Sequence, residues 1–351
     1  MTDATRVLIV APNWLGDIVM ALPSVAAVRR HYAVEHLSVA LPRAMAPVVR
    51  MIPGLDAVVP LEGGHGGIAT DAATLAAGRY DIAILFPNSF RSAWVTHRAS
   101  IVERWGYGAG FRGWLLTRAI KRLPRGGHHS ESYRTLLRKL NISVESDAVT
   151  LVVTDAQRAR GAALLERYKV TSGASIVVIA PGAAHGHAKQ WLPVRFAEVT
   201  RRSVMELGRT VVFVGSPDDR PVGRAIESAL TQFGHGLSDD GRVVNLIGHT
   251  DIPTLIGVLA GCDACVSNDT GAMHLAAALA RPVVAVFGPS DERATAPAGR
   301  HTLLTHPVRC RPCLLRDCPI DHRCMTGIST DDVFDALARC LTSDEPKAVS
   351  W

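Results

Sequence analysis

The sequence has 351 residues, of which 48% are hydrophobic and 20% are charged, and its formal net charge is +6. This length suits two domains that each bury a core, and the composition excludes a disordered or fibrous protein. No apolar run reaches the roughly 20 residues that a transmembrane helix needs, and residues 1–6 lack the layout of a signal peptide. We therefore expect a cytoplasmic protein without a transmembrane segment.

Basic residues gather in the first half of the chain. Residues 1–170 contain 21 Lys and Arg against 13 Asp and Glu, a net of +8, whereas residues 171–351 contain 17 against 19, a net of −2. Positions 91–139 hold eleven basic residues and only Glu103 and Glu131 as acids. This clustering predicts an anionic partner such as phosphate groups or a membrane surface, and a solvated helical face is the alternative. Nucleic acid is not expected, because no nucleic-acid-binding motif occurs there.

Short apolar runs rich in β-branched residues alternate with helical patterns along the whole chain. Such runs, flanked by helices, predict strands of parallel sheets that are covered on both faces. The predicted strands are 7–10, 37–41, 57–59, 82–86, 176–179, 211–214, 243–246, 264–266 and 283–287. Two such series in succession predict an α/β protein with two Rossmann-like, doubly wound domains.

The join between the two series is predicted between Asn141 and Gly173. A predicted helix from Asp155 to Tyr168 ends there in a loop before a new strand begins. The predicted divisions are a domain of residues 1–165, a second domain of residues 172–335, and a C-terminal helix and tail of residues 336–351.

The first strand ends in a turn that contains Gly16 and Asp17, and an amphipathic helix from Ile18 to His31 follows. Ligands of open α/β sheets bind outside the carboxyl ends of the strands. Asp17 at the helix start can serve as a general base, and an N-cap is the alternative role. The turn contains no GxGxxG motif, which argues against a dinucleotide-binding dehydrogenase.

Two loops in the second half are suited to phosphate. Pro181 and Gly182 follow a strand, and Lys189 stands just before a helix expected to begin near Pro193. A glycine-containing loop with a lysine fits phosphate oxygens. The block from Ser267 to Gly271 joins another strand to an apolar helix, where free amides and the Thr270 hydroxyl can bind a diphosphate. An ordinary turn capped by Asp269 is the alternative.

Taken together, these segments resemble the bacterial heptosyltransferases of glycosyltransferase family nine. The resemblance covers nearly the whole chain, and Pro87–Ser92 and the cysteine-rich segment near the C-terminus resemble the heptosyltransferase II branch. Its motifs are Gly16-Asp17, Pro181-Gly182, Lys189-Gln190-Trp191, Ser267-Asn268-Asp269-Thr270-Gly271 with His274, Arg281-Pro282 and Phe287-Gly288-Pro289-Ser290.

The resemblance implies a GT-B fold with an acceptor domain first, a donor domain second, and a cleft between them. It implies an inverting transfer of heptose from ADP-heptose to an acceptor of lipid A, Kdo and heptose, with neither metal nor cofactor. Peripheral contact with the inner face of the inner membrane is part of this expectation.

The same resemblance assigns site residues. Asp17 matches the catalytic base, and Lys189 is expected to stabilise the leaving ADP. The expected donor-binding residues are Pro181, Gly182, Asp218, Asp269, Thr270, Gly271 and His274, with Asp219 as an alternative to Asp218 at the ribose. The basic first domain fits an anionic acceptor, and Arg91, Arg112 and Arg118, with Arg98 beside them, are the acceptor-binding candidates.

The cysteines allow two interpretations. Cys310, Cys313, Cys318, His322 and Cys324 have spacings that can supply zinc ligands. Reduced thiols that order a C-terminal loop are the alternative, and the resemblance implies no metal there. Cys262 and Cys265 also have CxxC spacing, but Cys265 falls in a predicted buried strand, so core packing is expected for them.

Three rival functions remain at this point. The nearest is heptosyltransferase I or another GT-B sugar transferase. A nucleotide-sugar epimerase shares the two-domain architecture but needs acid and base groups around the sugar C2. A non-catalytic binding module with a basic face has no need of both Asp17 and Lys189.

Overall fold

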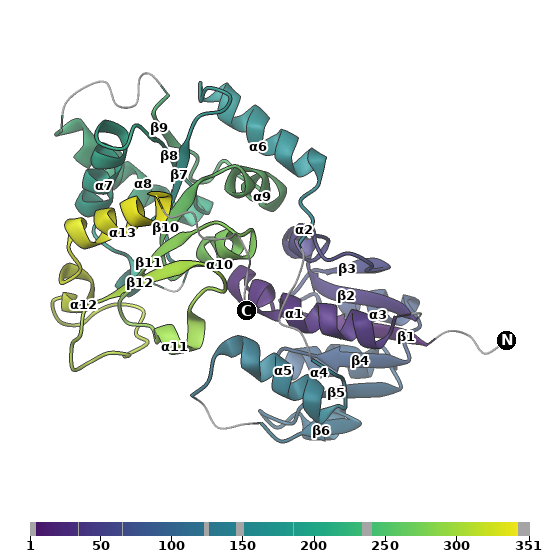
Figure 1. The fold of residues 1–351 in the computed structure, drawn as a ribbon. Helices are drawn as coiled ribbons and strands as arrows, with labels where there is room; N and C mark the ends of the chain where they lie inside the picture. The colour runs from purple at the N-terminus through teal and green to yellow at the C-terminus, as the bar shows by residue number, and fades with distance from the viewer. Residues whose placement is uncertain are drawn as a thin grey trace. The chain divides into compact units, whose positions relative to one another are not determined.

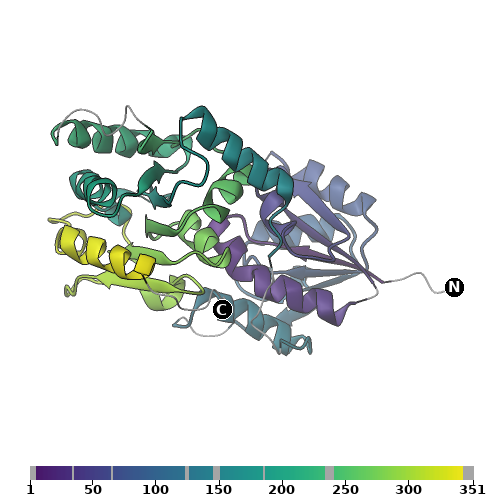
Figure 2. The same ribbon diagram turned by 45° about the horizontal axis from the view of Figure 1, so that its top comes forward.

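The structure is a computed structural model that describes residues 5–33, 35–64, 66–122, 126–144, 151–184, 186–233 and 241–342. The chain divides into two compact units, the first ending at Val152 and the second beginning at Val153. Each unit is a parallel sheet with helices on both faces (Figures 1 and 2).

The first unit is built on a six-stranded sheet in the order β3-β2-β1-β4-β5-β6. Its strands are β1 (Arg6–Val10), β2 (His36–Pro42), β3 (Ala57–Leu61), β4 (Ile82–Leu85), β5 (Glu103–Tyr107) and β6 (Arg118–Ile120). Its helices are α1 (Leu15–His31), α2 (Ala46–Val49), α3 (Ile68–Ala77), α4 (Phe90–Arg98) and α5 (His129–Lys139), with the 3₁₀ turns η1 (Arg43–Met45) and η2 (Gly113–Leu115).

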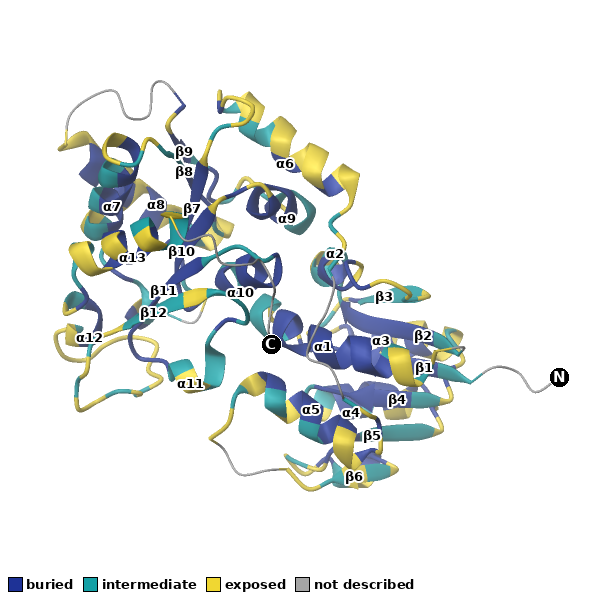
Figure 3. Cartoon of the chain, viewed as in Figure 1, coloured by how far each residue is buried: buried dark blue, intermediate teal, exposed yellow. Residues whose placement is uncertain are grey.

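The two faces of this sheet bury different helices. Alternate residues of a strand point to opposite faces, so Leu8 and Val10 enter the core that Leu75 of α3 and Ala93 of α4 complete. Helices α1 and α5 pack against each other. The central strands are accordingly buried along their length, whereas the helices expose their outer sides (Figure 3).

The second unit repeats the same design with the order β12-β11-β10-β7-β8-β9. Its strands are β7 (Ile176–Ala180), β8 (Thr210–Phe213), β9 (Val243–Asn245), β10 (Ala264–Asn268), β11 (Val283–Phe287) and β12 (His301–Thr305). Its helices are α6 (Asp155–Arg167), α7 (Pro193–Met205), α8 (Arg220–Thr231), α9 (Ile252–Ala260), α10 (Gly271–Ala278), α11 (Glu292–Thr295), α12 (Arg323–Thr326) and α13 (Thr330–Thr342), with 3₁₀ turns η3 (His187–Lys189) and η4 (Pro217–Asp219).

In both sheets the order in which strands are added therefore reverses. After three strands the chain returns to the other side of the first strand, so that strands one and four of each unit are neighbours. This reversal is the switch point at which doubly wound sheets bind ligands, outside the carboxyl ends of the strands. In the first unit it lies between β1 and β4, and in the second between β7 and β10. The predicted doubly wound architecture is confirmed in both units.

All the strands predicted from the sequence are present, but β5, β6 and β12 were not predicted. These three lie at or next to a sheet edge, and each contains polar or charged residues, so none is a continuous apolar run. Edge strands are buried less than central strands and so lack a continuous apolar run. The apolar criterion therefore finds the central strands and misses these three, although it also finds the edge strands β3 and β9.

The boundary between the units falls within the predicted join, yet earlier than the predicted end of the first domain at residue 165. The reason is that α6 packs on α9 of the second unit. Gly161 and Gly257 meet there so closely that a Cβ added to Gly161 would lie 2.5 Å from the Gly257 carbonyl carbon. At the other end, the predicted tail of residues 336–351 divides α13, which packs on α7 and β11 within the second unit.

Candidate functional site

Helix α1 brings Asp17 to the switch point of the first unit. The helix begins at Leu15, three residues earlier than predicted, with Trp14 at its N-cap position. Asp17 is therefore the third residue of the first turn, and the alternative role of Asp17 as N-cap is wrong. Its side chain is 32% exposed, so the carboxylate at the end of β1 can be reached by a ligand.

Helix α5 supplies the neighbours of Asp17. Nδ1 of His129 lies 3.6 Å from Oδ1 of Asp17. Burial, with a smaller contribution from the negative charge of Asp17, raises the pKa of Tyr133 well above its usual value. Its ring packs on Phe86 at 5.2 Å between centroids, so the phenol stays neutral. Sequence reasoning missed both residues, because α5 begins more than 100 positions after Asp17.

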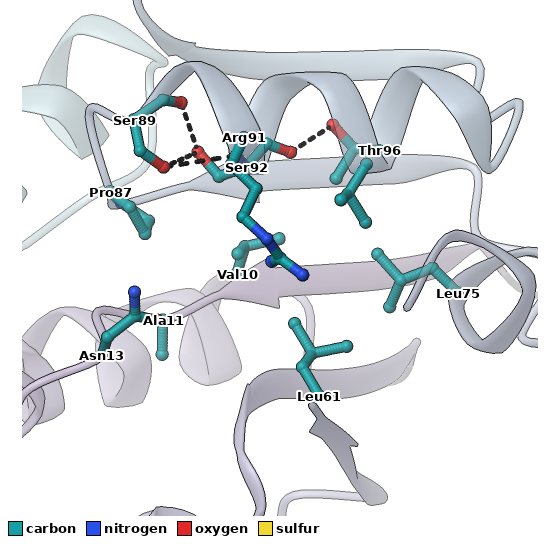
Figure 4. Close-up of a pocket in the computed structure, with 11 residues that line it drawn as sticks. Val10, Ala11, Asn13, Leu61, Leu75, Pro87, Ser89, Arg91, Ser92 and Thr96 are labelled. Carbon is teal, nitrogen blue, oxygen red and sulfur yellow. Dashed lines mark hydrogen bonds between the residues drawn. The ribbon is translucent and has the colours of Figure 1, made fainter. Parts of the chain in front are cut away.

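The loops after β1 and β4 enclose a small pocket, which Asn13 of the turn before α1 also lines (Figure 4). Arg91 points into the pocket, between Val10, Leu61 and Leu75. The hydroxyl of Ser89 accepts a hydrogen bond from the amide of Ser92 and so caps α4. The pocket is thus a mixed surface with apolar walls and one cation.

Arg91 also has a partner within the protein. Its Nη2 lies 2.5 Å from Oδ2 of Asp71, and its Nε donates to the Gly64 carbonyl at 2.8 Å. Asp71 is buried and accepts hydrogen bonds from the amides of Glu62 and Gly63 as well. Arg91 therefore closes the loop between β3 and α3 while its side chain lines the pocket.

Arg112 occupies a different place from the one expected of an acceptor-binding residue. It is completely buried, and its guanidinium donates to the carbonyl oxygens of Tyr107, Pro87 and Ser89 at 2.9, 2.6 and 3.0 Å. Burial lowers its pKa to about 10, with help from the charge of Arg122. The expectation of direct acceptor contact is corrected: Arg112 ties the loop after β5 to the loop after β4.

Arg118 also has partners within the fold, but it is only half-buried, so its contact with the acceptor stays a prediction. It lies on β6 and donates to the carbonyl oxygens of Leu140 and Lys139 at the end of α5, at 3.3 and 3.2 Å. A cation is favourable at a helix C-terminus, where carbonyl groups lack partners. Its guanidinium also lies over the Trp105 ring, 5.6 Å from the centroid.

At the switch point of the second unit, Lys189 and Asp269 form an ion pair. Nζ of Lys189 lies 2.6 Å from Oδ2 of Asp269, and their side chains are 21% and 6% exposed. Lys189 comes from η3 after β7, and Asp269 follows β10 directly. The fold thus joins the two predicted loops of this unit, 80 positions apart, through opposite charges.

Two polar side chains of β10 hold these loops in place. The amide of Asn268 donates to the Pro181 carbonyl at 2.7 Å, and its Oδ1 accepts from the Trp191 amide at 3.1 Å. The hydroxyl of Ser267 lies 3.3 Å from the Ala180 carbonyl. Both side chains are buried, so they position the loop after β7 rather than contact a ligand.

Thr270 caps helix α10. Its hydroxyl accepts from the Met273 amide at 3.4 Å and contacts Ser267 at 3.0 Å. The alternative role of Asp269 as cap is therefore wrong. The amides of Gly271 and Ala272 come before the first intrahelical bond, so helix geometry leaves them available to an anion. His274 lies one turn further on and is buried.

The loop after β8 contacts the loop after β7 through Asp219. One carboxylate oxygen accepts from the Ala183 amide at 3.3 Å, and the other accepts from the Ser216 amide at 2.8 Å. A Cβ on Gly182 would lie 2.3 Å from the Asp219 carboxylate, so a larger residue there would displace that carboxylate. Asp218 is exposed, and ribose binding by Asp218 stays a prediction.

The cysteine-rich segment supports the Lys189 loop. His322 Nε2 lies 2.6 Å from the Ala188 carbonyl, and the Ala188 amide donates to the Arg316 carbonyl at 2.8 Å. These two contacts clamp the residue next to Lys189 from both sides. Sequence reasoning missed this role, because His322 was considered only as a zinc ligand.

The cysteines themselves lie in contrasting environments. Cys310 and Cys318 are exposed, Cys313 is half-buried and Cys324 is buried. Within the described residues, no group of three or more His, Cys, Asp or Glu side chains is arranged to hold a metal ion, and His322 is engaged by Ala188.

Cys262 and Cys265 lie in the core of the second unit, as predicted. Both are completely buried, and burial raises the pKa of the Cys262 thiol to about 12. Thiols in such surroundings stay protonated and inert.

No helix in the described part of the chain is long and apolar enough to cross a membrane.

The similarity of this chain to characterised proteins extends over both units. Residues 71–323 match glycosyltransferase family 9 (heptosyltransferase). The lipooligosaccharide heptosyltransferase 2 of Haemophilus influenzae is 29% identical over 302 residues, which are 83% of this chain and 86% of that protein. The lipopolysaccharide heptosyltransferase 2 of Escherichia coli is 29% identical over 303 residues, 83% of this chain and 85% of that protein.

Comparison of structures gives the same result. The structure of Escherichia coli ADP-heptose heptosyltransferase II superimposes with a TM-score of 0.80 and 26% identity, covering 96% of this chain and 98% of that one. Two Rossmann-like units of this kind are the GT-B type of fold, as expected. The family match covers well over half of the sequence, so the chain belongs to glycosyltransferase family 9, the heptosyltransferase family, and is a glycosyltransferase.

Proposed function

We propose that this enzyme transfers a heptose from ADP-heptose to the heptosylated inner core of lipopolysaccharide, as a heptosyltransferase II does. Family membership and the two relatives named heptosyltransferase 2 support the reaction class. The observation that carries the proposal is the Lys189–Asp269 pair beside the start of α10. A lysine and free helix amides at a switch point are suited to a nucleoside diphosphate.

The donor half of the reaction belongs to the second unit in this proposal. The ADP diphosphate binds the amides at the start of α10, and Lys189 neutralises the charge that develops as ADP leaves. Asp269 orients Lys189 through their 2.6 Å contact. Pro181, Gly182 and His274 shape the donor site from the loop after β7 and from α10, and Asp218 binds the ribose.

The acceptor half belongs to the first unit. Asp17 accepts the proton of an acceptor hydroxyl while the oxygen of that hydroxyl attacks the anomeric carbon of the donor. The bond between that carbon and the ADP oxygen breaks, its electron pair leaves with ADP, and the configuration inverts. This displacement needs no metal ion, because Lys189 and the helix amides meet the charge of the leaving group.

Acceptor recognition follows from the charge of the first unit. The acceptor of lipid A, Kdo and heptose is anionic, and Arg91 is the cation that lines the pocket beside Asp17. Arg112 acts indirectly, since its buried guanidinium holds backbone carbonyls, whereas the half-buried Arg118 is a further acceptor-binding residue. We place the enzyme in the cytoplasm, at the inner face of the inner membrane where this acceptor is made.

The decisive experiment supplies ADP-heptose with either a mono-heptosylated or a heptose-free acceptor and weighs the products. We expect one heptose to be added to the mono-heptosylated acceptor alone. Addition to the heptose-free acceptor instead would indicate a heptosyltransferase I. A changed sugar without an acceptor adduct would indicate an epimerase, and the anomeric configuration of the product tests inversion.

A further inference from the structure

An aromatic patch lies on the first unit, outside its core. It consists of Phe90, Trp94 and His97 on α4, Trp114 on η2, and Phe111 on the turn before η2. The rings of Phe90 and Trp94 stack at 6.1 Å, and Trp94 stacks on His97 at 5.8 Å. Trp114 meets both Trp94 and His97 edge-on, at 6.4 and 6.3 Å.

The patch exposes large apolar rings to water. Phe111 is 94% exposed, Trp114 is 67% exposed and Phe90 is 46% exposed. Only Trp94 packs partly against the core of the unit. Leaving an aromatic ring in water forgoes the stabilisation that burial of its apolar surface would give. A contiguous group of rings, here Phe90, Trp94, His97 and Trp114, marks a binding surface. Phe111 adds a further exposed ring three positions before Trp114.

The backbone presents Phe111 to solvent at a conformational cost. Gly110 and Phe111 both adopt left-handed conformations, with φ of 64° and 57°. A bulky residue rarely adopts this conformation without strain. Packing within the unit does not offset this conformational cost, because the ring of Phe111 is almost fully exposed. The strain therefore serves the outward position of the ring.

Arg112 makes the patch rigid. Its buried guanidinium bonds the Tyr107 carbonyl, on the strand that leads to Phe111, and the Ser89 carbonyl, which precedes Phe90. The turn with Phe111 and the start of α4 are thus clamped to each other. A rigid presentation lowers the entropy cost of binding.

The surroundings of the patch are cationic. Arg98 ends α4 beside His97 and is exposed. Arg122 is also exposed and lies close enough to lower the pKa of Arg112. The one acid of the segment between them, Glu103, is bonded by the side chains of Thr117 and Trp105.

We infer that the aromatic patch docks the enzyme onto the surface of an anionic lipid bilayer. Tryptophan and phenylalanine rings insert at the level of the lipid headgroups, and flanking arginines are attracted to anionic lipids. Phe90 also lies directly between Ser89 and Arg91, which line the pocket of the first unit. Docking there brings that pocket to the membrane. The inference rests on the proposed function only in that the acceptor is carried by a lipid.

The test is co-sedimentation of the full-length enzyme with vesicles of phosphatidylcholine containing phosphatidylglycerol. We expect the wild type to bind, and Phe111→Ala/Trp114→Ala to lower the partition coefficient about tenfold through lost apolar burial. Arg98→Gln/Arg122→Gln should lower it about fivefold for each charge removed. The control is Met205→Ala/Leu314→Ala, which removes two exposed apolar side chains, 61% and 68% exposed, from the second unit and should leave binding unchanged.

Three outcomes would overturn the inference: no binding by the wild type, equal binding by the aromatic double variant, or an equal loss in the control. Loss of self-association in the aromatic variant, with vesicle binding intact, would assign the patch to a protein interface instead.

A transfer assay separates this inference from the proposed function. Phe111→Ala/Trp114→Ala should use a deacylated, water-soluble acceptor as well as the wild type does, and lose activity only on acceptor embedded in vesicles. If neither protein transfers heptose, the proposed function fails, while the vesicle-binding result stands by itself. Slower transfer to the soluble acceptor would contradict a purely docking role.

Discussion

The two switch points of this enzyme have the same topology and opposite designs. In the second unit, Lys189 and Asp269 pair at 2.6 Å, and the buried side chain of Asn268 on β10 fixes the segment between β7 and α7. In the first unit, Asp17 is partly exposed, and the ring of His129 approaches it only to 3.6 Å. At the second switch point the two charged groups pair with each other, whereas at the first the Asp17 carboxylate is accessible to solvent.

This difference matches two chemical tasks. A site for a diphosphate must hold positive charge and amides in place before the leaving group develops its charge. A base must instead reach a hydroxyl that arrives with the acceptor. We therefore expect substitutions in the second unit to affect donor binding and turnover together, and substitutions at Asp17 to affect turnover alone.

The largest effect is expected from Asp17→Asn. The amide keeps the shape of the side chain but cannot accept the proton, and a general base contributes up to about 10⁴-fold to the rate. We expect kcat to fall at least a thousandfold, with ADP binding by calorimetry and the unfolding temperature both unchanged. Equal losses of ADP binding and turnover would assign Asp17 a structural role, and the two switch points would then not differ in their tasks.

Lys189→Met should have the next largest effect. Loss of one group that stabilises developing charge costs about 10²–10³-fold in kcat, and ADP affinity should fall as well. The single variant also leaves the buried Asp269 carboxylate without its ion-pair partner, and this destabilises the fold. The double variant Lys189→Met/Asp269→Asn removes both charges, so it should regain stability without regaining activity. Recovery of activity in the double variant would refute the role of Lys189.

The sequence was most informative where burial is greatest. Strands such as β1 and β10 are buried on both faces, and their continuous apolar runs make them easy to recognise. Asp17, Lys189 and Asp269 lie in the segments that follow such strands, and the resemblance to the family assigned their roles. The pairing of Lys189 with Asp269 was not predicted, because it depends on the order of strands in the sheet.

Arg112 shows where reasoning from the sequence fails. It lies in a stretch rich in basic residues, and nothing in the neighbouring sequence separates it from the exposed Arg98. Its burial follows from the contact between the loops after β4 and β5, which only the fold creates. His322 is similar, since its contact with Ala188 spans 134 positions.

Arg112→Ala tests whether the first switch point depends on a buried clamp. The substitution leaves the carbonyl oxygens of Tyr107, Pro87 and Ser89 without this donor, and each buried group without a partner costs about 1–3 kcal/mol. We expect the free energy of unfolding to fall by about 2–4 kcal/mol in urea titrations. Arg98→Ala is the matched control, an exposed arginine that should change stability by less than about 0.5 kcal/mol. Equal stability of the two variants would show that the buried clamp contributes nothing.

A smaller effect is expected from His322→Ala. The variant loses the contact with the Ala188 carbonyl next to Lys189, so the lysine is held less firmly. We expect kcat to fall about tenfold, in keeping with the loss of positioning rather than of a reacting group. His322→Asn, which can still donate a hydrogen bond, should recover part of the loss. An effect as large as that of Lys189→Met would give His322 a direct role.

The smallest effect is expected from removal of metal ions. In the proposed mechanism Lys189 and the amides at the start of α10 stabilise the negative charge of the leaving ADP, and one ring nitrogen of His322 is engaged by Ala188. Dialysis against a chelator should therefore leave turnover and the unfolding temperature unchanged, as followed by product mass and by thermal unfolding. If turnover falls and a divalent cation restores it, a metal ion performs the role assigned to Lys189. If the unfolding temperature alone falls, Cys310, Cys313, Cys318 and Cys324 hold a structural ion, and the Lys189 loop is supported by that ion as well as by His322.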